Sequence, residues 1–397
     1  MNTRACAVLL SGLSLLPSGA LAQELSINGF LTQGFFYTDN NNIYGNSSDG
    51  SFDFREVAVN ARYRILPQLH IAGQLMSRRA GEVDDGSPQI DYALVDYRIA
   101  ENSVAQYGVR AGRLKIPFGF YNETRDVAFT RPSVILPQSL YFDQARDLEL
   151  SVDGFGVYGG TDLGSGRLDM DLVYGMPRKD ENVEYAYLTF DASGHFDDSE
   201  GMMLRGIYSS EGNRFRAGLT LAEFKLGYKP KSGNSFPADL KEFSKGDLKV
   251  DVAVLSGQYN TERWSFTSEY MWHKVDWREL GGVFTQRPQT EFESYYLQAQ
   301  YRFAPGWDFI ARYDVLYLDK SDRNGEENSA AFRRAPYNFF AKDLTLGVGW
   351  QPDPAWLIRA EYHYVDGTGW LPEQDNTDDS DAARYWNIFA LQVTYRF

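Results

Sequence analysis

The charged side chains that could act together most directly lie in the first half of the chain. Arg113 and Lys115 end one extended segment, and Arg125, Asp126 and Arg131 follow within the next connection. Basic groups around a narrow passage favour anions. This run of charges makes residues 113–131 the first candidate for a site that acts through charge rather than through covalent chemistry.

The residue types needed for covalent or metal chemistry are scarce or badly spaced. The single cysteine, Cys6, excludes disulfide frameworks and iron–sulfur clusters. No Gly-x-Ser-x-Gly elbow, phosphate-binding loop or dinucleotide fingerprint occurs. The four histidines are scattered and never recur in a metal-binding spacing: His70, His195, His273 and His363. We therefore expect no enzymatic activity, no cofactor and no metal site.

The composition of the 397 residues favours strands. Tyr and Phe number 26 each and Gly 36, whereas the mean hydropathy is only -0.43. The net charge of -15 lacks the basic footprint of a nucleic-acid-binding protein, so we expect no nucleic acid partner. A negative mean hydropathy is compatible with a membrane barrel, in which apolar and polar positions alternate.

Residues 1–22 have the features of a secretory signal peptide. Arg4 supplies a positive start, an apolar stretch runs to Leu16, and a small-x-small cleavage pattern ends at Ala22. No later apolar run approaches the ~18 residues that a spanning helix needs. We expect export through the periplasm, cleavage, and a single domain over residues 23–397.

Strict alternation of apolar and polar residues marks the extended segments. From Phe389 to Phe397 every odd position is apolar, while the even positions are polar or small. This period allows one face to meet lipid and the other to meet water. A Tyr-Arg-apolar tripeptide closes four segments, as in Tyr395-Arg396-Phe397, and places tyrosine rings at one membrane interface.

The recurrence of this pattern predicts an all-β, 16-stranded antiparallel transmembrane β-barrel. Eight long connections alternate with seven short turns, which places both mature ends on the short-turn side, as in the Gram-negative outer membrane. A soluble β-sandwich with an inward apolar face is the alternative. The expected strands lie near 24–38, 52–65, 69–79, 89–99, 104–116, 147–158, 167–176, 201–209, 213–223, 248–259, 262–275, 291–303, 307–318, 342–351, 355–366 and 384–397.

The third long connection, 117–146, differs from the others. Pro117 ends the preceding strand because proline cannot donate to the ladder. The connection also carries apolar residues that an external loop would expose to water: Val127, Ala128, Phe129, Val134, Ile135 and Leu136. We predict that this third loop folds into the lumen, packs them on the wall and turns its charges toward a channel.

The run Gly112 to Gly119, with Thr124-Arg125-Asp126-Val127-Ala128-Phe129 behind it, resembles the corresponding stretch of the phosphate-selective porin O/P family. The chain as a whole is similar in architecture to 16-stranded Gram-negative porins. The resemblance implies a trimeric diffusion channel whose third external loop narrows the pore. It also implies basic residues along an anion path. On this basis Arg113, Lys115, Arg125 and Arg131, together with Asp126, are the five constriction candidates.

Seven arginines on the polar phase of their strands are the candidate pore-lining residues: Arg62, Arg64, Arg98, Arg110, Arg302, Arg312 and Arg359. In one interpretation they create a positive field that favours anions. In the other they pair with inward acids, which removes the net field: Asp96, Asp308, Asp314 and Glu361. The sequence leaves both interpretations open.

These features predict an outer-membrane porin for passive diffusion of small hydrophilic solutes, with anions or phosphate preferred. The expected partners are outer-membrane lipid and lipopolysaccharide, the solutes, and two further copies in a homotrimer. A plugged structural or ligand-binding barrel without general channel activity is the alternative function. The acidic cluster of the last long connection fits no calcium loop and is expected to be solvated: Glu373, Asp375, Asp378, Asp379 and Asp381.

Overall fold

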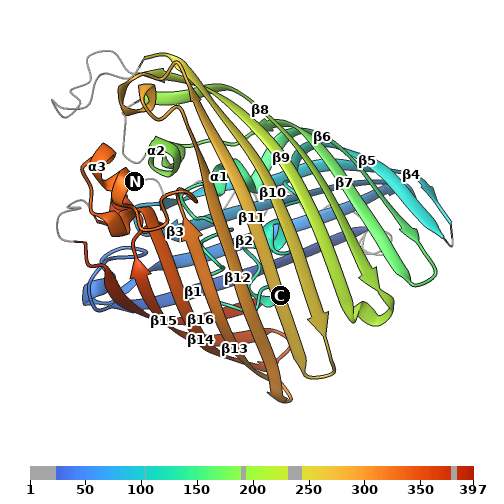
Figure 1. Cartoon of the computed structure of the whole chain (residues 1–397). Coiled ribbons are helices and arrows are strands. Elements are labelled where there is room, and N and C mark those ends of the chain that lie inside the picture. The colour runs from blue at the N-terminus through green and yellow to red at the C-terminus, as the bar shows by residue number, and fades with distance from the viewer. Residues whose placement is uncertain (1–23, 103, 189–193, 231–243, 377–381) are drawn as a thin grey trace, which may run out of the picture.

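The computed structural model describes residues 24–102, 104–188, 194–230, 244–376 and 382–397. In these residues sixteen antiparallel strands close into one barrel, in which each strand pairs with its sequence neighbours and β1 pairs with β16 (Figure 1). The predicted 16-stranded barrel is therefore confirmed. The expected signal peptide, 1–22, lies outside the described residues, as do Asp378, Asp379 and Asp381 of the acidic cluster.

The strands of the barrel are β1 (Leu25–Thr38), β2 (Ser51–Leu66), β3 (Leu69–Ala80), β4 (Asp84–Glu101), β5 (Ala105–Lys115), β6 (Ser151–Asp162), β7 (Gly166–Pro177), β8 (Gly194–Ser210), β9 (Phe215–Pro230), β10 (Gly246–Asn260), β11 (Trp264–Arg278), β12 (Gln289–Ala304), β13 (Trp307–Tyr317), β14 (Phe340–Asp353), β15 (Trp356–Gly367) and β16 (Tyr385–Arg396). Because β1 and β16 pair from Phe30↔Arg396 to Thr38↔Ile388, the sheet has no free edge.

Short helices lie in the connections. They are α1 (Arg146–Leu150), α2 (Asn182–Leu188) and α3 (Glu326–Phe332), with the 3-10 turns η2 (Ser47–Asp49), η3 (Asn122–Thr124), η4 (Ala128–Thr130), η5 (Glu211–Asn213), η6 (Gly282–Thr285), η7 (Pro336–Phe339) and η8 (Glu373–Asp375). Among the described residues, none of the helices combines the length and apolar character needed to cross a membrane. Helices α2 and α3 lie at the barrel end that carries the long connections (Figure 1).

The alternation of side chains separates an outer face from an inner one. On β16, Phe389 and Leu391 are exposed on the outside, whereas Gln392 and Thr394 are fully buried on the inside. Large apolar side chains on the outer phase of the other strands are exposed in the same way. The soluble sandwich is therefore wrong, because these residues do not pack between two sheets.

The largest apolar cluster lies inside the barrel. It joins residues of the β5–β6 connection, such as Leu140 and Tyr141, to wall residues such as Val254 and Tyr296. The packed interior is thus built between the wall and a connection rather than between sheets.

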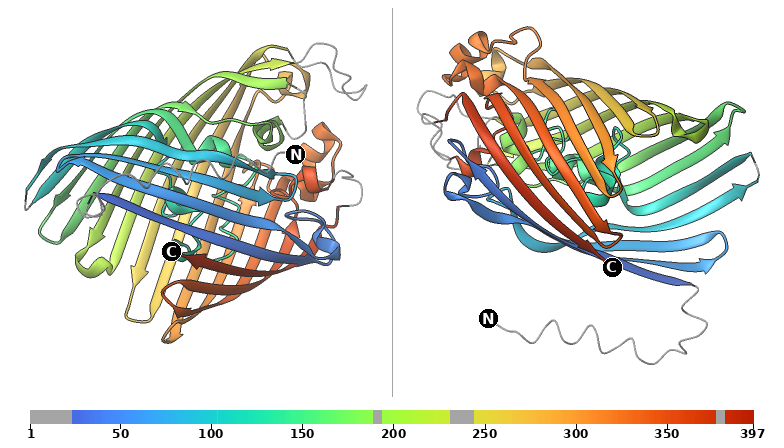
Figure 2. Two further views of the ribbon diagram at one scale, coloured as in Figure 1. Left: turned by 180° about the vertical axis from the view of Figure 1, so that it is seen from behind. Right: turned by 90° about the horizontal axis from the view of Figure 1, so that it is seen from below.

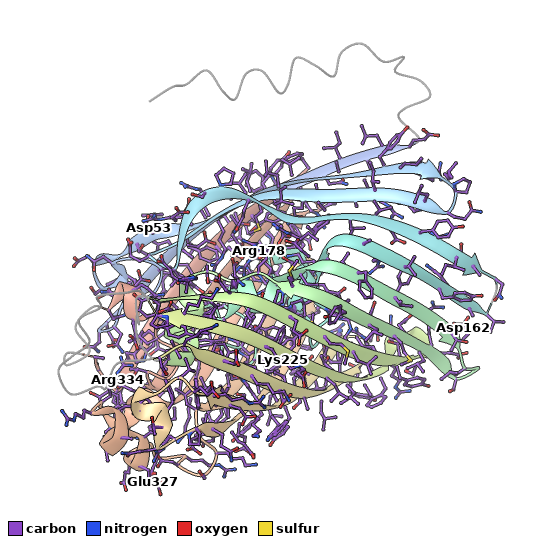
Figure 3. All side chains as sticks on the ribbon, turned by 90° about the horizontal axis from the view of Figure 1, so that it is seen from above. Asp53, Asp162, Arg178, Lys225, Glu327 and Arg334 are labelled. Atoms are coloured by element: carbon purple, nitrogen blue, oxygen red, sulfur yellow. The ribbon has the colours of Figure 1, made fainter. Side chains whose placement is uncertain are left out.

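Several strands are longer than the sequence predicts. β8 begins well before the predicted strand 201–209, and β9 ends well after the predicted strand 213–223. The extensions carry charges on the outer phase, where Lys225 Nζ of β9 lies 2.9 Å from Glu200 of β8 (Lys225 is labelled in Figure 3). A second outer pair, Lys249 Nζ with Glu223 at 2.9 Å, lies beside it at the start of β10. The alternation of apolar and polar residues predicted strands that are too short at these ends, because cross-strand ion pairs replace apolar contacts there.

Aromatic rings gather on the outer face near the short turns. Trp264 stacks on Tyr301 at 4.4 Å between ring centroids, and Trp307 stacks on Trp350 at 5.3 Å. Such rings are typical of the interface between apolar band and water in membrane barrels. The tyrosines of the Tyr-Arg-apolar tripeptides belong to this belt.

We expect the outer face to contact lipid, which a charge substitution tests. Leu255 lies on the outer phase of β10 and is 59% exposed. Leu255→Arg should destabilise the barrel by about 2–4 kcal/mol in lipid vesicles, because it places a charge against the hydrocarbon. The control is Leu163→Arg in the β6–β7 turn, outside the strands. Equal urea midpoints for both variants in vesicles would contradict a lipid-facing β10.

Candidate channel interior

The connection between β5 and β6, residues 116–150, lies inside the ring of strands. Its teal coil lies within the barrel in both views of Figure 2. We call it the β5–β6 loop. Its side chains and backbone contact wall residues of β2 and β3 on one side and of β11, β13 and β15 on the other.

A buried ion-pair cluster joins this loop to the side of the barrel formed by β2, β3 and β4. Asp143 of the loop lies 3.0 Å from Arg78 Nη2 of β3 and 3.2 Å from Arg125 Nη2. Lys115 Nζ lies 2.5 Å from Asp91 and 3.1 Å from Asp126. The cluster consists of five basic and six acidic residues: Arg78, Lys115, Arg125, Arg131 and Arg146, with Glu56, Asp84, Asp91, Asp126, Asp143 and Glu149.

Burial alone does not set the protonation of the loop acids. Burial opposes ionisation of Asp143, but Arg78 and Arg125 outweigh it and hold the pKa of Asp143 below its usual value. Burial raises the pKa of Glu149 to about 8, even though Arg125 lies 3.6 Å away. Asp143 is therefore an ion-pair partner at neutral pH, whereas Glu149 is mainly protonated.

Three carboxylates of alternate strands hold the loop on the opposite wall. Glu269 of β11 accepts from the Tyr141 hydroxyl at 2.5 Å and from the Phe120 N–H at 3.0 Å. Asp314 of β13 accepts from the N–H and the hydroxyl of Ser139. Glu361 of β15 accepts two adjacent backbone N–H groups of the loop, those of Val134 at 2.6 Å and Ile135 at 3.2 Å.

Two wall arginines complete this attachment. Arg312 donates to the Ser133 hydroxyl at 3.0 Å. Arg359 donates to two loop carbonyls, that of Arg131 at 2.5 Å and that of Ala128 at 2.9 Å. The loop therefore spans the interior between two walls, and its polar backbone groups are satisfied by inward side chains.

The structure brings together four of the five predicted constriction residues. Lys115, Arg125, Asp126 and Arg131 all belong to the ion-pair cluster and are largely buried. Arg113 lies elsewhere. It shares the outer phase with exposed Tyr107 and pairs with exposed Asp153 at 2.7 Å, so its side chain does not reach the interior.

The seven predicted pore-lining arginines fall into three groups. Arg98 and Arg110 pair with Glu101 and Asp96, and Arg312 and Arg359 hold the loop. The remaining three lie on the inner phase near the short turns, where no carboxylate among the described residues pairs with them: Arg62, Arg64 and Arg302. Pairing with carboxylates therefore describes Arg98 and Arg110. An unpaired positive charge describes the last three arginines.

The predicted acidic partners behave differently from one another. Asp96 pairs with Arg110 as the second interpretation expected, at 3.1 Å. Asp314 and Glu361 are instead acceptors for the loop. Glu269, which contributes as much to this attachment, was missed in the sequence. The sequence shows only that Glu269 is a carboxylate on the polar phase of a strand. It does not show that the β5–β6 loop supplies the donors.

Comparisons with known proteins support the fold. No protein family and no curated protein matches this sequence. Among solved structures, the anion-selective porin from Comamonas acidovorans is similar at a TM-score of 0.59 and 12% identity, covering 94% of this chain and 99% of that one. The trimer form of OmpT, an outer membrane protein of Vibrio cholerae, gives 0.56 and 13% over 94% and 99%. The outer membrane channel DcaP of Acinetobacter baumannii gives 0.55 and 11% over 94% and 97%. At these identities the likeness concerns the fold.

The attachment of the loop to β15 can be tested by removing its acceptor. Glu361→Ala leaves two buried N–H groups of the loop without a partner, at about 1–3 kcal/mol each. The open population of the loop should rise roughly tenfold or more, and trypsin should cleave after Arg125 correspondingly faster. Glu200→Ala, which removes an exposed carboxylate from β8, is the control. Unchanged cleavage of Glu361→Ala would contradict the anchoring role.

The raised pKa of Glu149 predicts a pH dependence. Its folded pKa of about 8 lies above an unfolded value of about 4.3, so the folded state binds the extra proton between these values. This contribution to stability is complete below about pH 4 and is lost as the pH rises through 8. Between about pH 5 and 8.5, the wild type should lose a few more degrees of thermal stability than Glu149→Gln. The heat-modifiable gel shift measures this, with Glu262→Gln in a short turn as the control. Parallel curves for wild type and Glu149→Gln would refute the assignment.

Proposed function

We propose that this protein is a porin of the Gram-negative outer membrane that lets small hydrophilic solutes diffuse passively, without enzymatic activity. The closed barrel with an apolar outer face and a charged inner face carries this proposal. The similarity in fold to an anion-selective porin and to an outer membrane channel supports it. The path runs between the wall and the β5–β6 loop, which sets its narrowest width.

The preferred solutes in this proposal are anions, phosphate among them. Five inner-phase arginines near the short turns have no carboxylate partner among the described residues: Arg62, Arg64, Arg216, Arg302 and Arg396. Unpaired basic groups at a channel mouth raise the local anion concentration. The cluster residues Lys115, Arg125, Asp126 and Arg131 contribute to width rather than to selectivity, because the acids and bases of the whole ion-pair cluster compensate one another.

A homotrimer is part of the same proposal. The comparison with a protein solved in a trimer form supports it. Lipopolysaccharide and outer-membrane lipid are the proposed surroundings of the outer face. Light scattering of the purified protein in detergent tests the trimer, and a monomer mass would overturn it.

A plugged barrel is the second candidate function. It is favoured by the β5–β6 loop, which is anchored on both walls and packs into the largest apolar cluster. A barrel whose interior is closed would serve a structural or ligand-binding role. The two candidates differ in one measurement, because only a porin conducts ions.

Planar-bilayer recording of the purified protein tests both candidates. We expect stepwise conductance and, in a salt gradient, a reversal potential on the anion side. The double variant Arg62→Gln/Arg302→Gln should shift that potential toward cation preference, because it removes two unpaired charges. Lys225→Gln, which removes a charge on the outer face, should leave it unchanged.

A silent barrel would overturn the porin and support the plugged barrel. Conductance with the same reversal potential in the double variant and in the wild type would overturn anion selection by the arginines and retain the channel.

A further inference from the structure

A cavity of about 180 Å³ lies against the inner wall formed by β4, β5, β6 and β7, beneath the start of the β5–β6 loop. These four strands are neighbours in the barrel (Figure 1). Most of its lining is apolar, and it includes Tyr92, Leu94, Leu114, Pro117 and Val173. The ion-pair cluster and the anchoring contacts described above do not account for this space.

The size of the cavity fits one six-membered ring. An engineered apolar cavity of about 150 Å³ binds benzene in water, so this partly open cavity of about 180 Å³ has room for one such ring. Gly156 of β6 forms part of the lining. A Cβ at this position would lie 3.3 Å from Leu114 Cδ1 and 3.3 Å from Val173 Cγ2, both of which also line the cavity. The absence of a side chain at Gly156 therefore helps to keep the space open.

The charged groups of the lining are not equivalent. Glu123 and Asp171 both pair with Arg205, at 2.6 and 2.8 Å. Lys115 is occupied by two carboxylates of the ion-pair cluster. Arg110 differs, because only its Nε makes a hydrogen bond, to Asp96 at 3.1 Å.

The guanidinium of Arg110 is also held in place. It lies 4.1 Å from the centroid of the Tyr158 ring, and the Tyr158 hydroxyl donates to the other oxygen of Asp96 at 2.7 Å. Both terminal nitrogens of Arg110 have no hydrogen-bond partner among the described residues. A fixed guanidinium with two spare donors at the edge of an apolar cavity suits a planar carboxylate.

We propose that this cavity is a binding site for small monocyclic aromatic carboxylates, with the ring between Tyr92, Leu114 and Val173 and the carboxylate on Arg110. The site deepens the proposed function and rests on it for its role, since it would retain such solutes on their way through the barrel. Benzoate is the simplest probe of this class.

Equilibrium dialysis of benzoate against the detergent-solubilised full chain tests the site without requiring conductance. Arg110→Gln should weaken benzoate binding about tenfold or more and leave benzyl alcohol binding unchanged, because only the carboxylate needs the charge. Gly156→Ala should weaken both ligands by filling the cavity. Gly206→Ala, on the outer phase of β8 with no atom within 4 Å of the added Cβ, is the control and should bind as the wild type does.

A size exchange keeps the proposal testable if Gly156→Ala does not fold. Leu114→Ala enlarges the cavity and should shift the preference from benzoate toward 2-naphthoate, an effect that general destabilisation would not produce. Equal benzoate binding by wild type and Arg110→Gln, or tighter binding of benzylamine than of benzoate, would overturn the site.

Bilayer recording separates this proposal from the proposed function. Benzoate binding by a barrel that does not conduct would retain the site and overturn the channel. Conductance without benzoate binding would retain the channel and overturn the site.

Discussion

Closure of the sheet is the constraint on which the rest of this structure depends. In a hydrocarbon environment every backbone N–H and C=O needs a partner within the protein, and a ring of strands meets this need without leaving an edge. The pairing of β1 with β16 completes the ring. Once the ring is closed, the two-residue period of each strand divides the side chains into an outer apolar set and an inner polar set.

The inner set creates a second requirement, which the β5–β6 loop meets. Buried charges are costly unless they are paired and hydrogen-bonded. Among the described residues, Arg359 of the wall would lose both of its hydrogen-bond acceptors without the loop, and the Val134 and Ile135 N–H groups of the loop would lose their acceptor without Glu361. Wall and loop therefore satisfy each other's polar groups, which explains why a connection that carries three buried arginines of its own is stable inside the barrel.

The charge distribution along the barrel axis follows from the same argument. Where the loop fills the interior, acids and bases are matched within one cluster. Near the short turns the loop reaches the wall at Phe129, whose ring lies 4.1 Å from the Arg396 guanidinium. Arg62 and Arg302 at this level are exposed to water and are therefore tolerated without carboxylate partners. Selectivity and width are accordingly assigned to different levels of the proposed channel. The cavity beside Arg110 lies between these two levels.

The period-two pattern by itself determined the number of strands, their inner and outer faces and the closed barrel, because strand periodicity is a local property of the chain. It also singled out the 117–146 connection through its unusual apolar content. Strand ends were placed less well, since the outward ion pair of Lys225 with Glu200 is formed by residues of different strands.

Only the tertiary structure decided what each charge does. Arg113 and Lys115 are two residues apart in the sequence, yet one pairs on the outer face and the other joins the buried cluster. Glu269 and Asp143 gained their roles from partners more than a hundred and more than sixty residues away. A local pattern states which face most side chains of a strand occupy, but at the strand end Lys115 turns inward against that pattern. The energy of a charge depends on which other charges the closed ring brings within a few ångströms of it.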